Sequence, residues 1–215
     1  IPSGRDHLGS LWRVSRVPVR ADLALMEGYH SPQVDVDIRL NTNEAPVGPP
    51  AEFLAEYLRE VARIQWNRYP DRSAGSLRKA IAELHDVDPA MVFVANGSNE
   101  VLQTLLLTFA GPGRSVVTFE PTYQLHAHIA RITGATVIEG SRRDDFTIDE
   151  SHARELVQTH SPHVVFLCSP NNPTGTVDPA STVSMVLSST TNGLVVVDEA
   201  YGQFASSSSI DIVSE

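Results

Sequence analysis

The chain has 215 residues, of which 41% are hydrophobic and 20% are charged, a composition typical of a globular protein with a full core and one large α/β domain. Its 26 acidic and 16 basic residues give a formal net charge of −10, which argues against a nucleic-acid-binding protein because such a protein needs a basic face. No stretch approaches the run of apolar residues that a membrane span requires, and a secretory signal is not expected.

The N-terminal part is predicted to be an arm that leads into a turn-rich loop from Leu40 to Pro50. Prolines and glycines interrupt any long element before this loop, and one short helix is expected near Ala21–Glu27. We therefore divide the chain into residues 1–50 and residues 51–215.

Two helices are predicted next. From Ala51 to about Ile64, apolar residues recur at helical spacing, which is typical of an amphipathic helix. After a loop, Ser76 is expected to cap a second helix. The buried face of this second helix is expected to carry Leu77, Ile81 and Leu84.

From Met91 onward the pattern changes to alternating strands and helices. Such alternation predicts right-handed βαβ units, and therefore an α/β fold with a doubly wound, mostly parallel sheet. The expected strands are 91–95, 115–119, 136–139, 164–167 and 194–197, and the expected helices are 100–110, 123–133, 151–159 and 179–188.

The last two strands are continuous apolar runs, which is typical of strands buried on both faces, and both end in polar turns. Ser-Pro-Asn-Asn-Pro-Thr-Gly follows one at 169–175, and Asp-Glu-Ala-Tyr follows the other at 198–201. Ligands of an open parallel sheet bind beyond the carboxyl ends of its strands, so Asn172 and Asp198 are expected at this rim. A buried carboxylate must be solvated or paired, and capping a helix is the alternative role for Asp198.

A further turn, Asn96-Gly-Ser-Asn99, is expected between a strand and the start of a helix. Gly97 lets the backbone turn tightly, and Ser98 with the following amides would point at an anion. The turn has neither the Walker pattern nor the G-x-G-x-x-G pattern, so a nucleotide is not indicated. From these residues alone, a capped helix without a ligand is the favoured alternative.

Histidine and cysteine offer little chemistry in this sequence. Cys168 is the single cysteine, which excludes an intramolecular disulfide and suits a reducing cytoplasm. With no histidine near it in sequence, we expect it to be a buried and inert thiol. His126 and His128 are two positions apart, so they lie on different faces of a helix. We interpret them as surface or core residues and expect no metal site.

Five motifs, in this order and spacing, resemble the aspartate-aminotransferase superfamily of fold type I pyridoxal-phosphate enzymes. The resemblance begins near Ala21, and within the superfamily it is strongest to the histidinol-phosphate aminotransferases. The motifs are Leu40-Asn-Thr-Asn-Glu-Ala-Pro46, Arg68-Tyr-Pro-Asp71, Asn96-Gly-Ser-Asn-Glu100, Glu120-Pro-Thr-Tyr123, and the pair Ser169–Gly175 with Asp198–Tyr201.

The resemblance implies pyridoxal 5′-phosphate as the cofactor and assigns roles to several residues. Ser98 and Asn99 match positions that bind the cofactor phosphate. Tyr123 matches an aromatic residue that stacks on the cofactor ring, although ordinary packing is the alternative. Residues 51–215 would then be part of the cofactor-binding large domain.

The remaining ring contacts are implied in the same way. Asp198 matches the acid that faces the pyridine nitrogen and keeps the ring protonated, so that the ring accepts electrons. Asn172 and Tyr201 match residues that hydrogen-bond the ring hydroxyl.

Three earlier residues complete the implied site. Tyr69 matches a tyrosine that reaches the cofactor phosphate of the other subunit, which implies a homodimer. Asn43 and Glu44 match a loop near the substrate, so residues 1–50 would comprise an arm and a substrate-side loop. An asparagine-rich turn without a ligand is the alternative for this loop.

The resemblance also implies a lysine that forms a Schiff base with the cofactor. The family places it after a further strand, so it is expected beyond Glu215, and no catalytic residue is expected within the chain. Lys79, the only lysine, lies in an earlier helix and is interpreted as a solvent-facing charge. We therefore expect a fragment that lacks the C-terminal part and is inactive by itself.

The implied reaction is amino transfer between L-histidinol phosphate and 2-oxoglutarate, with L-glutamate as a product, in cytoplasmic histidine biosynthesis. Two alternatives stay open. An aminotransferase for aromatic or other amino acids would keep every motif, because substrate choice depends on loops and on the C-terminal half. A non-catalytic α/β binding or assembly module is the other alternative.

Overall fold

The computed structural model describes residues 18–24, 26, 28, 32, 34–38 and 41–213. The chain divides into two units, Ile1–His30 and Ser31–Glu215. The first unit contains η2 (Ala21–Leu23), a single 3-10 turn, where the sequence predicts a longer helix. All further elements belong to the second unit.

Some of the expected features lie outside the described residues. These are the arm over residues 1–17, residues 25 and 27 of the expected short helix, Leu40 and Glu215. The division of the chain after residue 50 stays a prediction.

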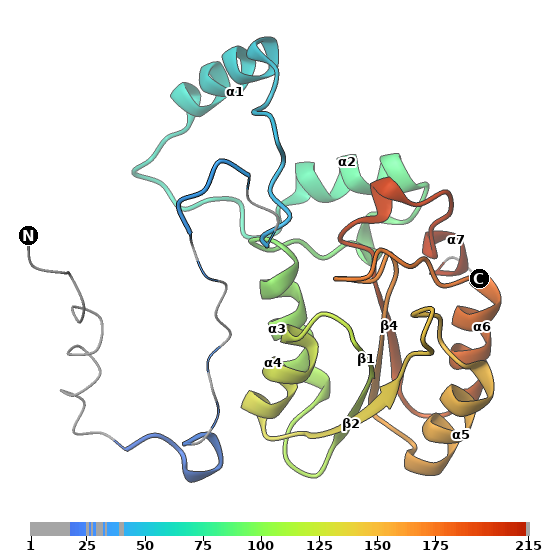
Figure 1. The fold of residues 1–215 in the computed structure, drawn as a ribbon. Coiled ribbons are helices and arrows are strands. Elements are labelled where there is room, and N and C mark those ends of the chain that lie inside the picture. The colour runs from blue at the N-terminus through green and yellow to red at the C-terminus, as the bar shows by residue number, and fades with distance from the viewer. Residues whose placement is uncertain are drawn as a thin grey trace, which may run out of the picture. The chain divides into compact units, whose positions relative to one another are not determined.

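The second unit is built on a four-stranded sheet in the order β2-β1-β3-β4 (Figure 1). All three neighbouring pairs are parallel. The strands are β1 (Ser115–Glu120), β2 (Thr136–Ser141), β3 (Val164–Cys168) and β4 (Leu194–Asp198). The predicted α/β fold with a parallel sheet is therefore confirmed.

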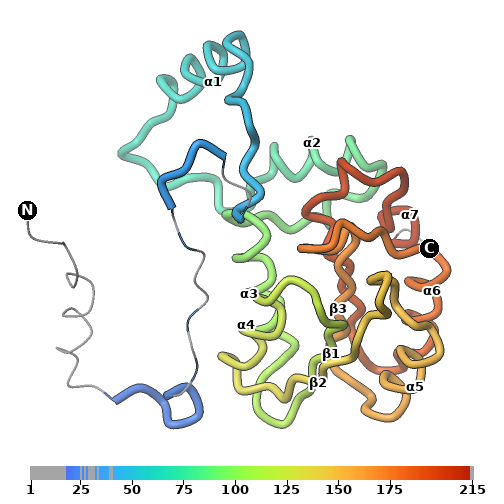
Figure 2. The backbone as a smooth tube through the Cα atoms, in the orientation of Figure 1, coloured from blue at the N-terminus to red at the C-terminus, as the bar shows by residue number. Residues whose placement is uncertain are grey.

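Helices cover both faces of this sheet, as the ribbon and the tube show (Figures 1 and 2). One face is covered by α3 (Ser98–Phe109) and α4 (Leu125–Thr133). The opposite face is covered by α5 (Glu150–His160) and α6 (Ala180–Ser189). This arrangement confirms the doubly wound architecture, with the helices within about two residues of their predicted positions.

Two hydrophobic cores lie on the two faces because successive side chains of a strand point in opposite directions. Val117 and Phe119 of β1 pack with residues of α5 and α6. Val116 of the same strand packs with residues of α3 and α4. Every residue of β3 is buried, as its continuous apolar run predicts.

The direction in which successive strands are added to the sheet reverses between β1 and β3, while the strands themselves stay parallel. The connection through α4 leads from β1 to β2 at one edge, whereas the connection through α6 leads from β3 to β4 at the other. Such a reversal opens a crevice outside the carboxyl ends of the two central strands. The turns that follow β1 and β3 therefore mark the expected place for a ligand.

The predicted strand over 91–95 is wrong. The segment instead begins with η3 (Pro89–Met91), a 3-10 turn, and continues as unpaired chain. A strand needs a hydrogen-bonded neighbour, and none of the described residues forms a ladder with this segment. Met91 and Phe93 are accordingly exposed.

The helices α1 (Ala51–Arg63) and α2 (Gly75–His85) are present as predicted, but their apolar faces are not covered. No residue of α1 is buried, and Ala82 is the only buried residue of α2. Leu77 and Leu84, expected inside, are exposed. Helical spacing determines which side chains share a face, but burial needs a neighbouring element.

The cap of α2 also differs from the prediction. Ser76 lies within the helix, and Ala74 occupies the N-cap position without a side-chain hydrogen bond. The carboxylate of Asp71 takes over this role by accepting hydrogen bonds from the backbone N–H groups of Gly75 and Ser73, each at 2.9 Å. An acceptor four residues upstream thus satisfies the first amide of the helix.

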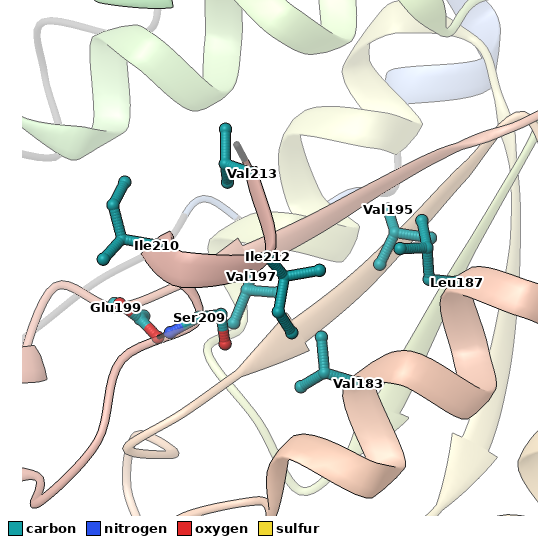
Figure 3. Close-up of a pocket in the computed structure, with 9 residues that line it drawn as sticks. All are labelled: Val183, Leu187, Val195, Val197, Glu199, Ser209, Ile210, Ile212 and Val213. Carbon is teal, nitrogen blue, oxygen red and sulfur yellow. Dashed lines mark hydrogen bonds between the residues drawn. The ribbon is translucent and has the colours of Figure 1, made fainter. Parts of the chain in front are cut away.

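The described chain ends with two short elements, η4 (Gly202–Phe204) and α7 (Ile210–Val213). Figure 3 shows α7 beside α6 and β4, where mostly apolar side chains line a pocket of about 270 Å³. Ile212 packs against the core on the α5 and α6 face of the sheet. This pocket lies on the opposite face from α3 and α4.

Candidate active site

A small pocket of about 80 Å³ lies at the carboxyl ends of the strands. Its lining comes from the start of α3 and from the turns after β1, β3 and β4. The lining residues are Ser98, Tyr123, Cys168, Asn172, Asp198, Ala200 and Tyr201. The fold thus brings together five of the residues that were singled out from the sequence, although they are spread over about one hundred positions.

A larger pocket of about 380 Å³ adjoins the first one. Tyr201 lines both pockets. Asn43 and Glu44, which the family resemblance leads us to expect near a substrate, line the larger pocket together with the turn after β3. The two pockets together offer more room than the smaller one alone.

Asp198 is the last residue of β4, and its side chain is almost completely buried. Its Oδ2 lies 2.9 Å from Nε2 of His126, and its Oδ1 accepts a hydrogen bond from the N–H of Ala200 at 3.0 Å. Burial acts to raise the pKa of Asp198, but the hydrogen bond and charge of His126, with the Ala200 N–H, outweigh burial and lower it. The pocket therefore holds an ionised carboxylate.

His126 is a residue whose role was missed in the sequence. Its ring is fully buried, stacks on Phe166 with a centroid distance of 4.4 Å, and meets the ring of Tyr123 edge-on at 5.5 Å. Within the described part of the chain, Nδ1 has no hydrogen-bond partner. One signal was present in the sequence, because a buried carboxylate such as that of Asp198 needs a partner.

The start of α3 is suited to an anion. Gly97 occupies the N-cap position with φ of +78° and provides no side-chain cap, and the Glu100 carboxylate in the first turn accepts a hydrogen bond from the N–H of Asn96 at 2.6 Å. The first backbone N–H groups, at Ser98 and Asn99, carry the positive end of the helix dipole. Asn99 does not line the small pocket, but its Oδ1 accepts a hydrogen bond from the hydroxyl of Tyr123 at 3.0 Å.

The turn after β3 is held by Asn171, a residue of the Ser169–Gly175 motif for which the sequence indicated no separate role. Asn171 is buried; its Oδ1 accepts a hydrogen bond from the Thr122 hydroxyl at 2.8 Å, and its Nδ2 donates to the Pro121 carbonyl at 3.0 Å. These bonds tie the turn after β3 to the turn after β1. The neighbouring Asn172 is half-buried and lines the small pocket.

A buried ion pair supports the same turn from the other side. Arg142 donates two hydrogen bonds of 2.9 Å to the carboxylate of Asp178, and both side chains are 1% exposed. Arg142 also donates to the carbonyl of Cys168 at 3.2 Å, and the Asp178 N–H donates to the Ser169 hydroxyl at 2.9 Å. Burial raises the pKa of Asp178 although the hydrogen bonds of Arg142 act against it.

Cys168 and Lys79 have the environments predicted for them. The thiol of Cys168 is buried and donates to the Pro170 carbonyl at 3.6 Å, and burial raises the pKa of this thiol. A thiol that stays protonated is a poor nucleophile. Lys79 faces solvent, with its Nζ 3.8 Å from the carboxylate of Glu83.

Tyr69 is not brought to either pocket. Its side chain is 98% exposed, and it is absent from the described lining of both pockets. Asn43, in contrast, donates a hydrogen bond from Nδ2 to the hydroxyl of Tyr201 at 3.0 Å. The loop that contains Asn43 and the turn after β4 are therefore in direct contact.

The described residues contain neither a candidate metal cluster nor a candidate membrane span. No group of three or more histidine, cysteine, aspartate or glutamate side chains is arranged to hold a metal ion there. None of the helices in the same part of the chain has the length and apolar character that crossing a membrane requires.

The chemistry of the small pocket favours one kind of ligand. An ionised carboxylate suits a protonated ring nitrogen, amide and phenol groups suit a ring oxygen, and an uncapped helix start suits a phosphate. The sides of the pocket thus match a phosphorylated aromatic molecule with a basic ring nitrogen.

Several known proteins are similar to this chain. Residues 35–215 match the family of class I and II aminotransferases. A histidinol-phosphate aminotransferase of Thermobifida fusca (strain YX) is 45% identical over 89% of this chain and 53% of the relative. One from Streptomyces avermitilis is 46% identical over 92% of this chain and 56% of the relative.

A solved structure is also similar. The histidinol-phosphate aminotransferase of Sinorhizobium meliloti, in complex with pyridoxal-5′-phosphate, has a TM-score of 0.69 and 26% identity over 76% of this chain and 44% of that protein. The chain spans about half the length of the curated relatives it matches.

Proposed function

The chain belongs to the class I and II aminotransferase family, and we propose that it supplies the cofactor-binding part of a pyridoxal-phosphate-dependent aminotransferase. One observation carries this proposal. Asp198 is buried at the end of β4, and His126 and the Ala200 N–H keep its pKa low. A carboxylate that stays ionised in a dry pocket holds a proton on the nitrogen of a bound pyridine ring.

The other groups of the small pocket fit the same cofactor. We propose that the start of α3, at Ser98 and Asn99, binds the cofactor phosphate. Asn172 and Tyr201 hydrogen-bond the ring hydroxyl, and Tyr123 supplies an aromatic face for the ring. When bound, the cofactor supplies a ring that accepts electrons from the substrate carbon next to the amino group.

Within the family, we propose L-histidinol phosphate and 2-oxoglutarate as the substrates and L-glutamate as a product. Support comes from the two relatives that carry the name histidinol-phosphate aminotransferase and are 45% and 46% identical to this chain. The larger pocket, with Asn43 and Glu44, is our proposed place for the substrate beside the cofactor. An aromatic amino-acid aminotransferase would use the same cofactor residues, so the choice of substrate needs a direct test.

Amino transfer by the intact protein provides that test. Purified protein loaded with pyridoxal phosphate is assayed with L-histidinol phosphate or L-phenylalanine as amino donor and 2-oxoglutarate as acceptor. We expect the higher kcat/KM with L-histidinol phosphate, and for Asp198→Asn a loss of several orders of magnitude in kcat with the cofactor still partly bound. Equal or better use of phenylalanine would favour the aromatic alternative. A loaded protein that transfers no amino group would overturn the proposed function.

We also propose that the intact protein is a homodimer in which Tyr69 completes the site of the second subunit. The exposed position of Tyr69 and its absence from the described lining of both pockets support this proposal. Mixing Tyr69→Phe with Asp198→Asn provides the test. Each hybrid dimer would have one site with both defects and one site with neither, so activity should return to about half of the wild-type value per hybrid dimer. Subunit exchange without any recovery would show that the sites are not shared.

We propose the cytoplasm as the compartment of this protein. The sequence has one cysteine, and its thiol is free and buried, which suits a reducing compartment. Fractionation of cells that express a tagged intact protein tests this, and recovery in the periplasm or the membrane fraction would contradict it.

A further inference from the structure

The hydrogen bond between Asn43 and Tyr201 joins residues that are 158 positions apart. Asn43 belongs to the loop before α1, where its φ of +52° places it in the left-handed region that asparagine tolerates. Tyr201 follows β4 and lines both pockets. The bond therefore connects the proposed substrate-side loop to a residue of the proposed cofactor pocket.

The direction of this hydrogen bond has a consequence for Tyr201. A tyrosine hydroxyl has one proton to donate and lone pairs that accept. Because Nδ2 of Asn43 is the donor, at 3.0 Å, the Tyr201 oxygen acts as the acceptor. The proton of Tyr201 is then available for a second partner, and donation to the oxygen strengthens the hydroxyl as a donor.

We propose that Asn43 is a positioning residue that acts on the cofactor through Tyr201. It holds the hydroxyl so that its proton is given to the ring oxygen of bound pyridoxal phosphate, before any substrate is present. This inference rests on the proposed function, and it goes beyond the substrate contact that the sequence suggests for Asn43.

The most informative variant is Asn43→Asp, which keeps the shape of the side chain but replaces the donating amide with a second accepting oxygen. The carboxylate would accept the proton of Tyr201 in a charge-assisted hydrogen bond. Tyr201 would then be withdrawn from the cofactor. We expect Asn43→Asp to resemble Tyr201→Phe, with the Kd for the cofactor raised about tenfold, as for the loss of one hydrogen bond.

Asn43→Gly removes the amide donor without putting an acceptor in its place, so it separates the loss of the hydrogen bond from the reversal of its direction. Glycine adopts the left-handed backbone without strain, and Tyr201 keeps its proton for the cofactor. We therefore expect a smaller rise in Kd, about threefold or less, since only the support for Tyr201 is lost.

A matched control is available two residues away. Asn41 donates to the carbonyl of Pro32 at 2.7 Å, so Asn41→Asp adds the same charge to the same loop without reversing a bond to Tyr201. We expect its cofactor affinity to stay within about twofold of the wild type, because exposed charges are screened.

The experiment uses the intact protein without substrate. Absorbance titration with pyridoxal phosphate gives the Kd and the spectrum of the bound cofactor for the wild type, Asn43→Asp, Asn43→Gly, Asn41→Asp, Tyr201→Phe and the double variant Asn43→Asp with Tyr201→Phe. We expect Asn43→Asp to change the spectrum in the same direction as Tyr201→Phe, and the double variant to match Tyr201→Phe alone.

Three outcomes would overturn the inference. A wild-type Kd and spectrum in Asn43→Asp would show that Asn43 does not act on the cofactor. An equal further weakening by Asn43→Asp in the Tyr201→Phe background would show that the effect does not pass through Tyr201. If the wild-type protein bound no pyridoxal phosphate, the proposed function itself would fail, and this inference with it.

Discussion

The segment that contains α1 and α2 and the segment from α3 to β4 have similar apolar side chains in very different surroundings. Leu58 of α1 is 56% exposed, whereas Leu106 of α3 is 0% exposed. Both lie on amphipathic helices, but only α3 rests on a sheet that presents side chains to it. An apolar helix face is therefore not a core until another element covers it.

Buried ion pairs are described only in the second of these segments. The described ion pairs of the first segment, Arg63 with Glu60 and Lys79 with Glu83, are exposed to solvent. The second segment also has exposed pairs, but in it Arg142 with Asp178 and His126 with Asp198 are buried. Buried pairs respond strongly when one partner is lost, whereas exposed pairs contribute little. The polar groups that shape the small pocket thus belong to the segment that contains the buried ion pairs.

The largest expected effect is the loss of Arg142. Arg142→Met keeps much of the side-chain volume but leaves the Asp178 carboxylate buried without its partner. We expect the free energy of unfolding to fall by about 3–5 kcal/mol. Urea unfolding of the intact protein, followed by fluorescence, measures this loss.

Two controls sharpen this measurement. Arg131→Ala removes an exposed ion pair with Glu139 and should cost under about 1 kcal/mol. In the double variant Arg142→Met with Asp178→Leu, no charge is left unpaired, so much of the stability should return. Equal losses of unfolding free energy for Arg142→Met and Arg131→Ala would contradict the assignment of Arg142 and Asp178 as a buried ion pair.

Adjacent leucines of α3 test the contrast between covered and uncovered apolar side chains. Leu106 is 0% exposed and Leu107 is 63% exposed. Leu106→Ala should lower the free energy of unfolding by about 2–5 kcal/mol, since it removes buried methyl groups and leaves a cavity. Leu107→Ala should change it by under about 0.5 kcal/mol. Urea unfolding of both variants measures the difference, and similar losses would show that Leu107 is covered by a part of the protein outside this chain.

The pair of His126 and Asp198 predicts a dependence on pH. The pKa of Asp198 is lowered in the folded state, so its stabilising contribution is present above the unfolded pKa of about 3.9 and is lost as the pH falls through the folded pKa. His126→Phe keeps a ring to stack on Phe166 but removes the donor. We expect a loss of about 1.5–3 kcal/mol at pH 6–7 that shrinks below about pH 4.

Unfolding free energies of the wild type and His126→Phe, measured from about pH 3 to pH 7, test this dependence. His128→Phe, two residues further along α4, is the control, and its difference from the wild type should not follow the titration of Asp198. A loss for His126→Phe that is constant over the whole range would show that the histidine contributes by packing alone.

Much of the second segment could be predicted from the sequence because its signals are local. The strands β3 and β4 are continuous apolar runs, β1 and β2 contain shorter apolar stretches, and each helix has its own period, so the order of these elements predicts a doubly wound sheet. The placement of Asn172 and Asp198 follows from this topology, since ligands bind beyond the carboxyl ends of the strands. The strand predicted over 91–95 fails because pairing depends on a neighbour, which a local pattern does not reveal.

The partners within the site could not be predicted for a similar reason. His126 lies 72 positions from Asp198, and Arg142 lies 36 positions from Asp178. Only the folded sheet brings such residues together, and the sequence around Arg142 has no feature that marks it as buried. The need for a partner was visible at Asp198, but the identity of the partner was not.

The smallest expected effect concerns the uncovered face of α1. In the chain of 215 residues, Leu58→Ala should change the free energy of unfolding by under about 0.5 kcal/mol, because more than half of the side chain already faces water. Urea unfolding at two protein concentrations measures this change and also reveals any covering partner. A loss above about 1 kcal/mol that grows with protein concentration would show that a second copy packs on α1. A loss of that size at both concentrations would mean that another part of the same chain covers Leu58, and α1 would then belong with the buried segment.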